Sequence, residues 1–155
     1  MKEVKSCAFF GHRKIEERSK IKEKVKAFLI EKIENENFRR FYFGGFGEFD
    51  DICYEIVTEL KQRYSDIKRC FCVVDEKWLN KKPKWLEKIE YEEIISFALA
   101  FEWWYKRIYF RNCAMIDQSD FVVFFVVDKE NSGANKSLVY AKSKKKSLIN
   151  SADIK

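Results

Sequence analysis

The residues best suited to ligand chemistry form a glycine-rich turn, Phe43-Gly44-Gly45-Phe46-Gly47-Glu48-Phe49-Asp50. Glycines between a strand and a helix let the backbone turn sharply and bring its N–H groups close to a ligand, and the first N–H groups of the helix attract an anion. The expected ligand group is therefore a phosphate or a carboxylate. Asp50 either caps the helix or accepts hydrogen bonds from a ribose hydroxyl. The turn matches neither the Walker A motif nor Gly-x-Gly-x-x-Gly.

A second motif, Gly11-His12-Arg13, follows the first apolar run of the chain. His12 is the only histidine, and Arg13 carries a planar guanidinium that suits a phosphate. Together they would place a basic pair beside the glycine-rich turn. In the alternative interpretation, Arg13 pairs with Glu16 or Glu17 on the surface and His12 caps a turn.

Two later segments carry polar residues that fit either turns and caps or ligand contacts. The first contains Arg111 and Asn112, and it ends at Asp117, Ser119 and Asp120. The second is Ser132-Gly133-Ala134-Asn135, in which Ser132 or Asn135 could cap a helix or contact a ligand.

Hydrolysis of a bound nucleotide would need a carboxylate or an imidazole within hydrogen-bonding reach of the reacting atom. The candidate groups are Glu48, Asp50, Asp51 and His12. An acidic side chain in a phosphate-facing loop repels the ligand, so Glu48 either has a chemical task or points away from the ligand.

The elements that must position these residues follow from the apolar pattern of the sequence. Apolar runs predict strands at 7–10, 41–43, 67–74 and 121–127. The last run has no polar alternation, which is typical of a strand covered on both faces. Apolar residues at helical spacing predict helices over 21–33, 50–64, 105–117 and 136–144. The remaining predicted elements are a short helix at 85–91, a strand within 95–101 and a strand at 147–149.

This alternation predicts an α/β fold, with a Rossmann-like, open and mainly parallel sheet flanked by helices in a single domain over residues 1–155. In such sheets the ligand binds outside the carboxyl ends of the strands. Glycine is scarce, with five in 155 residues, so each position is informative. All five glycines are predicted at this edge of the sheet, namely Gly11, Gly44, Gly45, Gly47 and Gly133.

Composition excludes several classes of protein. With 46% hydrophobic residues and a single proline, the chain is neither disordered nor of low complexity. The net charge is +6, but residues 136–155 hold six lysines against one aspartate, and the basic end is 142–155. The other 135 residues are nearly neutral, which argues only weakly for a nucleic-acid groove along the whole molecule.

The five cysteines are an odd number, and most lie in apolar runs, so they are predicted to be buried thiols in a reduced compartment. Cys70 and Cys72 are two residues apart and far in sequence from His12, so no metal site is expected. The sequence shows neither a signal-peptide core nor a run of membrane-spanning length, and a cytoplasmic location is expected.

Four motifs in this order resemble the YpsA-like branch of the SLOG superfamily, which also includes the DNA-processing protein A fold and the LOG phosphoribohydrolases. The resemblance covers about residues 5–150. The motifs are Phe9-Phe10-Gly11-His12-Arg13, the turn 41–50, Arg111-Asn112-x-x-Met115-Ile116-Asp117-x-Ser119-Asp120, and Ser132-Gly133-Ala134.

The resemblance implies a Rossmann-like sheet with a pocket for a nucleotide or a nucleotide-derived ligand. Carried over by position, the ligand-binding residues would be Gly11, His12, Arg13, Gly44, Gly45, Gly47, Asp50, Arg111, Asn112, Ser119 and Gly133. The LOG enzymes carry Pro-Gly-Gly-x-Gly-Thr-x-x-Glu, whereas this chain lacks the proline and has Glu48 for the threonine and Asp51 for the glutamate. These departures argue against phosphoribohydrolase chemistry.

Three functions remain open at this stage. The first is a small-molecule module that binds or senses a nucleotide-like ligand, and the second is a hydrolase of an N-glycosidic or phosphate bond. The third is single-stranded nucleic-acid binding, suggested by the lysine-rich end and the aromatic residues Trp103, Trp104, Tyr105 and Tyr109. Trp103 and Trp104 are equally candidates for a contact between two copies of the chain.

Overall fold

A computed structural model of the protein describes residues 3–44, 47–74, 90–97, 104–127 and 132–153. The strands are β1 (Lys5–Gly11), β2 (Phe38–Phe43), β3 (Lys68–Val73), β4 (Glu93–Ser96), β5 (Phe121–Phe125) and β6 (Leu148–Asn150). The helices are α1 (Arg18–Glu36), α2 (Glu48–Arg63), α5 (Trp104–Gln118), α6 (Gly133–Ser143) and the short 3-10 helix η1 (Ser151–Asp153).

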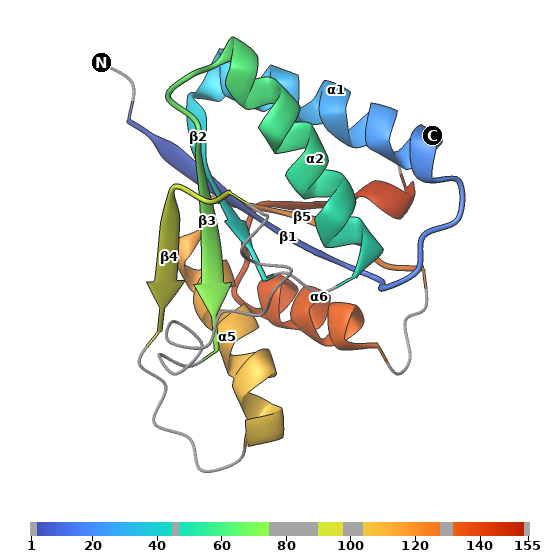
Figure 1. The fold of residues 1–155 in the computed structure, drawn as a ribbon. Coiled ribbons are helices and arrows are strands. Elements are labelled where there is room, and N and C mark those ends of the chain that lie inside the picture. Colours follow the sequence, from blue (N-terminus) through green and yellow to red (C-terminus); the bar gives the residue numbers. More distant parts are fainter. Residues whose placement is uncertain (1–2, 45–46, 75–89, 98–103, 128–131, 154–155) are drawn as a thin grey trace.

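The described strands form one sheet with the order β4-β3-β2-β1-β5-β6, and every neighbouring pair is parallel. Helices α1 and α2 cover one face of this sheet, and α5 and α6 cover the other (Figure 1). This arrangement confirms the predicted Rossmann-like α/β fold.

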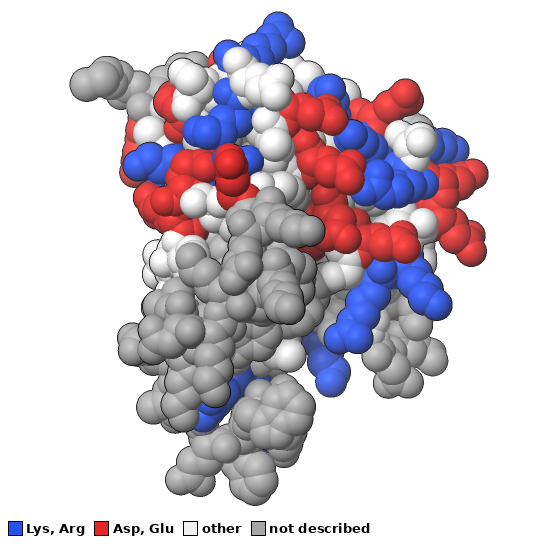
Figure 2. All heavy atoms as spheres, in the orientation of Figure 1, with Lys and Arg blue, Asp and Glu red and all other residues white. Residues whose placement is uncertain are grey.

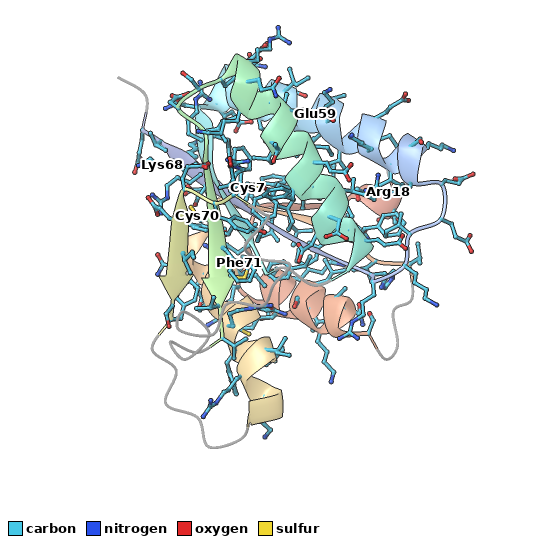
Figure 3. All side chains as sticks on the ribbon, viewed as in Figure 1. Cys7, Arg18, Glu59, Lys68, Cys70 and Phe71 are labelled. Atoms are coloured by element: carbon cyan, nitrogen blue, oxygen red, sulfur yellow. The ribbon has the colours of Figure 1, made fainter. Side chains whose placement is uncertain are left out.

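The core lies on both faces of the sheet because β5 is apolar throughout and β1 is apolar from Cys7 to Phe10. In β1, Cys7 and Phe9 pack toward α1 and α2, whereas Ala8 and Phe10 pack toward α5 and α6. β5 alternates in the same way, and Figure 3 shows Cys7 in the middle of the sheet. All five cysteine thiols are free and buried. Burial raises the pKa of both Cys70 and Cys72 to about 12, so neither is a ready nucleophile at neutral pH.

The edge strand differs from the sequence-based prediction. β4 begins at Glu93, two residues before the predicted strand within 95–101, because Glu93 forms an ion pair with Arg40 of β2 (Nη2–Oε2 2.6 Å). Tyr91 lies in a loop and not in the predicted helix 85–91, and residues 85–89 fall outside the described part of the chain. Residues 98–101 and Trp103 lie outside it as well.

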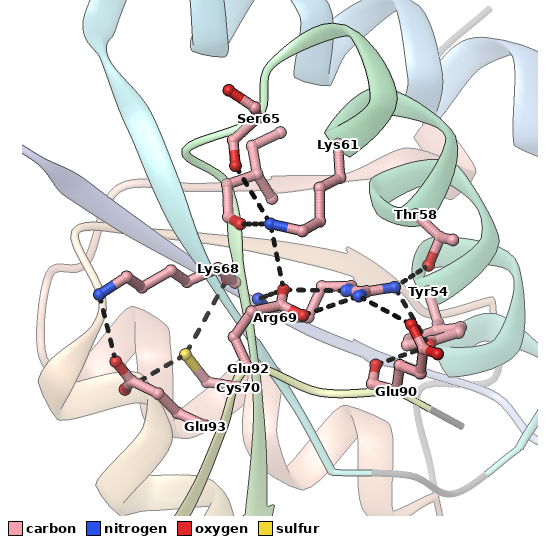
Figure 4. Close-up of polar contacts among 11 residues, drawn as sticks. Tyr54, Thr58, Lys61, Ser65, Lys68, Arg69, Cys70, Glu90, Glu92 and Glu93 are labelled. Atoms are coloured by element: carbon pink, nitrogen blue, oxygen red, sulfur yellow. Dashed lines mark hydrogen bonds and ion pairs between the residues drawn. The ribbon is translucent and has the colours of Figure 1, made fainter. Parts of the chain in front are cut away.

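A buried arginine fixes this edge to the rest of the molecule (Figure 4). Arg69 of β3 is 5% exposed and donates from Nε and Nη2 to the two carboxylate oxygens of Glu92, at 3.0 and 2.7 Å. Its Nη1 donates to the Tyr54 hydroxyl and to the Thr58 hydroxyl of α2, at 3.3 and 3.1 Å. Tyr54 in turn donates to the Glu90 carbonyl oxygen at 2.7 Å.

Among the described residues, the structure contains no helix that is long and apolar enough to cross a membrane.

Candidate functional site

The cavity that contains the sequence-predicted residues lies where the order of the strands in the sheet changes direction. β1 lies between β2 and β5; the helix after β1 packs on one face of the sheet, and the helix after β5 packs on the other. In open α/β sheets this divergence leaves a crevice outside the carboxyl ends of the two strands. Here the crevice is a cavity of about 350 Å³.

Most of the sequence-predicted ligand-binding residues line this cavity. They are Gly11, His12, Arg13, Gly44, Asp50, Arg111, Asn112 and Gly133. They come from β1 and the turn after it, from the end of β2, and from helices α2, α5 and α6. The structure therefore brings together residues up to 122 positions apart, from Gly11 to Gly133.

Among the described residues, two of the proposed ligand-binding positions, Gly47 and Ser119, are not in the cavity wall. Gly45 lies outside the described residues, and Gly47 lies beside the cavity as the N-cap of α2. Ser119 is buried, and its hydroxyl donates to the Met115 carbonyl oxygen at 2.6 Å. It sits between the end of α5 and the start of β5, so it lies at the amino edge of the sheet, opposite to the cavity.

The cavity wall also contains residues that the sequence did not single out as ligand contacts. Phe9, Phe10 and Ile108 form an apolar part of the wall, and α6 adds Ala134 and the polar side chain of Ser137. Ser137 follows Gly133 by one helical turn, so helical spacing alone could have identified it. Ser132, for which capping and ligand contact were both open, caps α6 and accepts from the Asn135 backbone N–H at 3.0 Å.

The surroundings and the backbone conformation differ among the glycines at this edge. A Cβ atom on Gly44 would lie 2.6 Å from Nη2 of Arg111, so the Arg111 side chain fills the space that a larger residue would need. Gly47 has a φ of 97°, a backbone conformation that side chains other than glycine rarely adopt. A Cβ atom on Gly133 would meet no other atom within 4 Å, so its Cα faces open space. Of these three, only Gly133 leaves room for the close approach of a ligand.

His12 is held by the end of β5. Its Nε2 accepts from the Val127 backbone N–H at 2.8 Å, and its ring packs edge-on against Phe125. Because Nε2 is the acceptor, the proton of the neutral ring lies on Nδ1. This hydrogen bond ties His12 to the bend after β5, and His12 also lines the cavity, so its contact with a ligand stays a prediction.

Glu48 points away from the cavity. Its Oε2 accepts from the Ile15 backbone N–H at 2.8 Å, and its own N–H donates to the Arg13 carbonyl oxygen at 2.9 Å. The Glu48 side chain therefore fixes the turn that carries His12 and Arg13. Among the proposed catalytic groups, His12 and Asp50 line the cavity.

The two helix N-termini at this edge differ in charge. The first turn of α2 contains Glu48, Asp50 and Asp51, and burial raises the pKa of Asp51. Asp50 is itself buried, with 8% of its surface exposed. These carboxylates already complement the positive pole of α2. The first turn of α6 contains no acidic residue, so its positive pole faces the cavity uncompensated by such a side chain.

Arg111 is the most deeply buried charged group of the wall, with 3% exposure. Burial lowers its pKa, and the nearby negative charge of Asp50 partly offsets this effect. Among the described residues, His, Cys, Asp and Glu side chains do not gather in a group of three that could hold a metal ion.

The structure is similar to that of DNA processing protein A from Helicobacter pylori, which was studied for its single-stranded DNA binding mode. The TM-score is 0.63 at 21% sequence identity, and the match covers 92% of this chain but 63% of the other, so this likeness shows a shared fold. No curated protein matches the sequence. A family model described as the YspA SLOG family matches residues 6–155, which confirms the resemblance noted in the sequence. The chain therefore belongs to the YpsA family of SLOG proteins.

Proposed function

We propose that this protein binds a nucleotide or a nucleotide-derived small molecule in the cavity at the carboxyl edge of β1 and β5. The observation that carries this proposal is the polarity of the cavity wall. The wall contains hydrogen-bond donors and a positive helix pole, a buried carboxylate, and apolar side chains.

The donor side suits a phosphate group. The N–H groups of Gly133 and Ala134 belong to the first turn of α6, which has no acidic side chain to compete with an anion. Arg13 is exposed at the rim of the same cavity and can form a bidentate contact with phosphate oxygens. This assignment moves the phosphate from the glycine-rich turn, where three carboxylates would repel it, to the start of α6.

The acceptor side suits a sugar hydroxyl. Asp50 is an acidic group in the cavity wall, and a carboxylate accepts hydrogen bonds from ribose hydroxyls in nucleotide-binding folds. Phe9, Phe10 and Ile108 supply apolar surface against which a sugar or base packs. The ligand class is thus a phosphorylated sugar or nucleoside with at least one free hydroxyl.

Isothermal titration with AMP, ADP-ribose, ribose 5-phosphate and adenosine tests this proposal. We expect binding of at least one phosphorylated probe, and a loss of about tenfold in its affinity in Arg13→Gln. Adenosine binding should be unaffected by this change. Lys14→Gln is the matched control, because it removes the same charge from the neighbouring residue, which does not line the cavity. The absence of heat with all probes, or equal effects of the two variants, would contradict the proposal.

A hydrolase is the second candidate function, and the position of Asp50 supports it. A carboxylate in a cavity can act as a general base on a water molecule that attacks the N-glycosidic bond. Release of ribose 5-phosphate from AMP, measured by chromatography, would then be lost in Asp50→Asn. It should persist in Glu48→Gln, because the Glu48 carboxylate is bound to the Ile15 N–H away from the cavity. Equal turnover in Asp50→Asn and the wild type would exclude this mechanism.

Single-stranded DNA binding is the third candidate, suggested by the fold shared with DNA processing protein A. The lysine-rich residues 142–146 lie at the end of α6, and Nζ of Lys146 donates to the Ser119 carbonyl oxygen at 2.8 Å. They are therefore at the amino edge of the sheet, opposite to the cavity. If an oligonucleotide binds through these lysines, AMP should not displace it. Competition between AMP and the oligonucleotide would indicate instead that the oligonucleotide binds at the cavity.

A further inference from the structure

Arg111 lines the cavity, but it is 3% exposed and its guanidinium is bound by other groups of the protein. Its Nη1 donates to the Gly44 and Cys72 carbonyl oxygens at 3.0 and 3.3 Å. Nε and Nη2 donate to Oδ1 of Asn112 at 3.3 and 2.9 Å. The planar guanidinium of Arg111, which could otherwise hold a phosphate, thus joins the ends of β2 and β3 to the Asn112 side chain of α5.

These contacts orient the Asn112 amide. Because Oδ1 accepts from Arg111, Nδ2 is on the opposite side, where it donates to the Ser137 hydroxyl at 3.4 Å. Ser137 in turn donates to the Gly133 carbonyl oxygen at 3.3 Å. A chain of hydrogen bonds therefore leads from Arg111 to the first turn of α6, where the proposed phosphate site lies.

Asp50 of α2 and Arg111 of α5 come from helices on opposite faces of the sheet, and both line the cavity. Burial lowers the pKa of the guanidinium, and the negative charge of Asp50 acts in the opposite direction. Both groups are buried, so removal of either would leave the other as an uncompensated charge in the wall.

We propose that Arg111 is a positioning residue: it fixes Asn112 so that Nδ2 is a donor to the anionic group at the start of α6, and it does not bind the ligand itself. The role in binding rests on the proposed function, whereas the orientation of Asn112 exists without a ligand. The two statements can therefore fail separately.

The ligand-free part is tested by NMR of the Asn112 side-chain amide. In the wild type, its two Nδ2 protons should have dispersed, exchange-protected resonances. Arg111→Met and Arg111→Lys should both shift them toward the values of a solvated amide, because lysine keeps the charge but cannot reach Gly44 and Asn112 with one planar group. Arg107→Met, on the preceding turn of α5 and outside the cavity wall, is the matched control. Unchanged Asn112 resonances in both Arg111 variants would overturn the proposal.

The ligand-dependent part is tested by a double-mutant cycle with AMP. Asn112→Ala and Arg111→Lys should each weaken AMP binding about tenfold. The double variant should also lose only about tenfold, because the two changes remove the same donor, Nδ2 of Asn112. A direct contact between Arg111 and the phosphate predicts instead that Arg111→Lys keeps most of the affinity and that the two losses multiply to about a hundredfold. If the wild type binds none of the probes, the proposed function fails and the NMR result alone decides the role of Arg111.

Discussion

Gly44 and Gly133 both line the cavity, but their Cα atoms have opposite surroundings. A Cβ atom on Gly44 would lie 2.6 Å from Nη2 of Arg111, whereas a Cβ atom on Gly133 would have no other atom within 4 Å. Nη2 is the far end of a long side chain and can move in principle. Here it is buried and bound to Asn112, so its displacement would break hydrogen bonds.

We therefore expect Gly44→Ala to lower the free energy of unfolding by about 1–3 kcal/mol, through displacement of Arg111. Gly133→Ala should leave stability unchanged or raise it by up to about 1 kcal/mol, since alanine favours the helix. It should nevertheless weaken AMP binding, because the added methyl group enters the space next to the first N–H groups of α6. Urea unfolding and calorimetric titration of both variants measure these effects. A destabilised Gly133→Ala protein would show that its Cα is not open.

At the scale of elements, the contact between α1 and α2 is a ladder of ion pairs. Glu55 and Glu59 of α2 bind Arg18, Lys22 and Lys26 of α1 at distances from 2.7 to 3.4 Å. Arg18 and Glu59 are labelled in Figure 3 on these two helices. Hydrogen bonds from Lys22 and Lys26 lower the pKa of Glu59. The side chains remain 26–44% exposed, so solvent weakens each pair.

Glu59→Gln should lower the free energy of unfolding by about 0.5 kcal/mol at pH 7. Because the pKa of Glu59 is lowered in the folded protein, its contribution is present above the ordinary value of 4.5 and is lost as the pH falls below it. Wild type and variant should therefore converge in stability in acid and at high salt. Glu23→Gln, an exposed position on α1, serves as the control in thermal unfolding at several pH values. A difference that persists at pH 3 would contradict the ion-pair explanation.

The β4 edge of the sheet is held by the ion pair between Arg69 and Glu92, which is more buried than the pairs between α1 and α2. Burial alone would raise the pKa of Glu92, but hydrogen bonds from the Arg69 side chain and backbone lower it. Glu92→Gln leaves the buried Arg69 guanidinium without its carboxylate and should cost about 2–3 kcal/mol of unfolding free energy. Glu90→Gln should cost less than about 0.5 kcal/mol, because Glu90 is 88% exposed and 4.0 Å from Arg69. Guanidinium chloride titration compares the two, and equal losses would show that the buried geometry is irrelevant.

Sequence pattern was sufficient for the elements whose signal is local. β1 and β5 were predictable because a strand covered on both faces has no polar alternation, and α1 and α2 because their buried residues recur at helical spacing. The start of β4 was predicted two residues too late. It depends on ion pairs of Glu92 and Glu93 with Arg69 and Arg40, which are far away in the sequence. α6 begins at Gly133, three residues before the predicted start, because Ser132 caps it.

The candidate site was predictable in outline, since glycine and polar residues after parallel strands must meet at one edge. The individual roles were not. The space beside the Cα of Gly44 is filled by the side chain of Arg111, which is 67 residues away in the sequence. A contact over this distance cannot be predicted from local sequence pattern. Ser119 lies in a motif with Arg111, but the helix between them carries it to the opposite edge of the sheet.

At the scale of the whole molecule, charge is divided between two regions. Figure 2 shows basic and acidic side chains interspersed over the face of α1 and α2, where many of them form the ladder of ion pairs. Lys142, Lys144 and Lys145 are exposed at the end of α6, and no described carboxylate lies within ion-pair distance of them. The net charge of +6 is therefore concentrated at this end of the molecule.

This charge distribution predicts that the protein binds a polyanion such as heparin through the lysine-rich end of α6. The triple change of Lys142, Lys144 and Lys145 to Gln should lower the NaCl concentration of elution from a heparin column about twice as much as the triple change of Lys20, Lys22 and Lys26 to Gln. Both variants lose three positive charges, but the second set is already paired with Glu17, Glu55 and Glu59. Circular dichroism verifies that both variants are folded. Equal shifts in elution would show that net charge alone governs the interaction, and that the lysine-rich end is not a distinct basic surface.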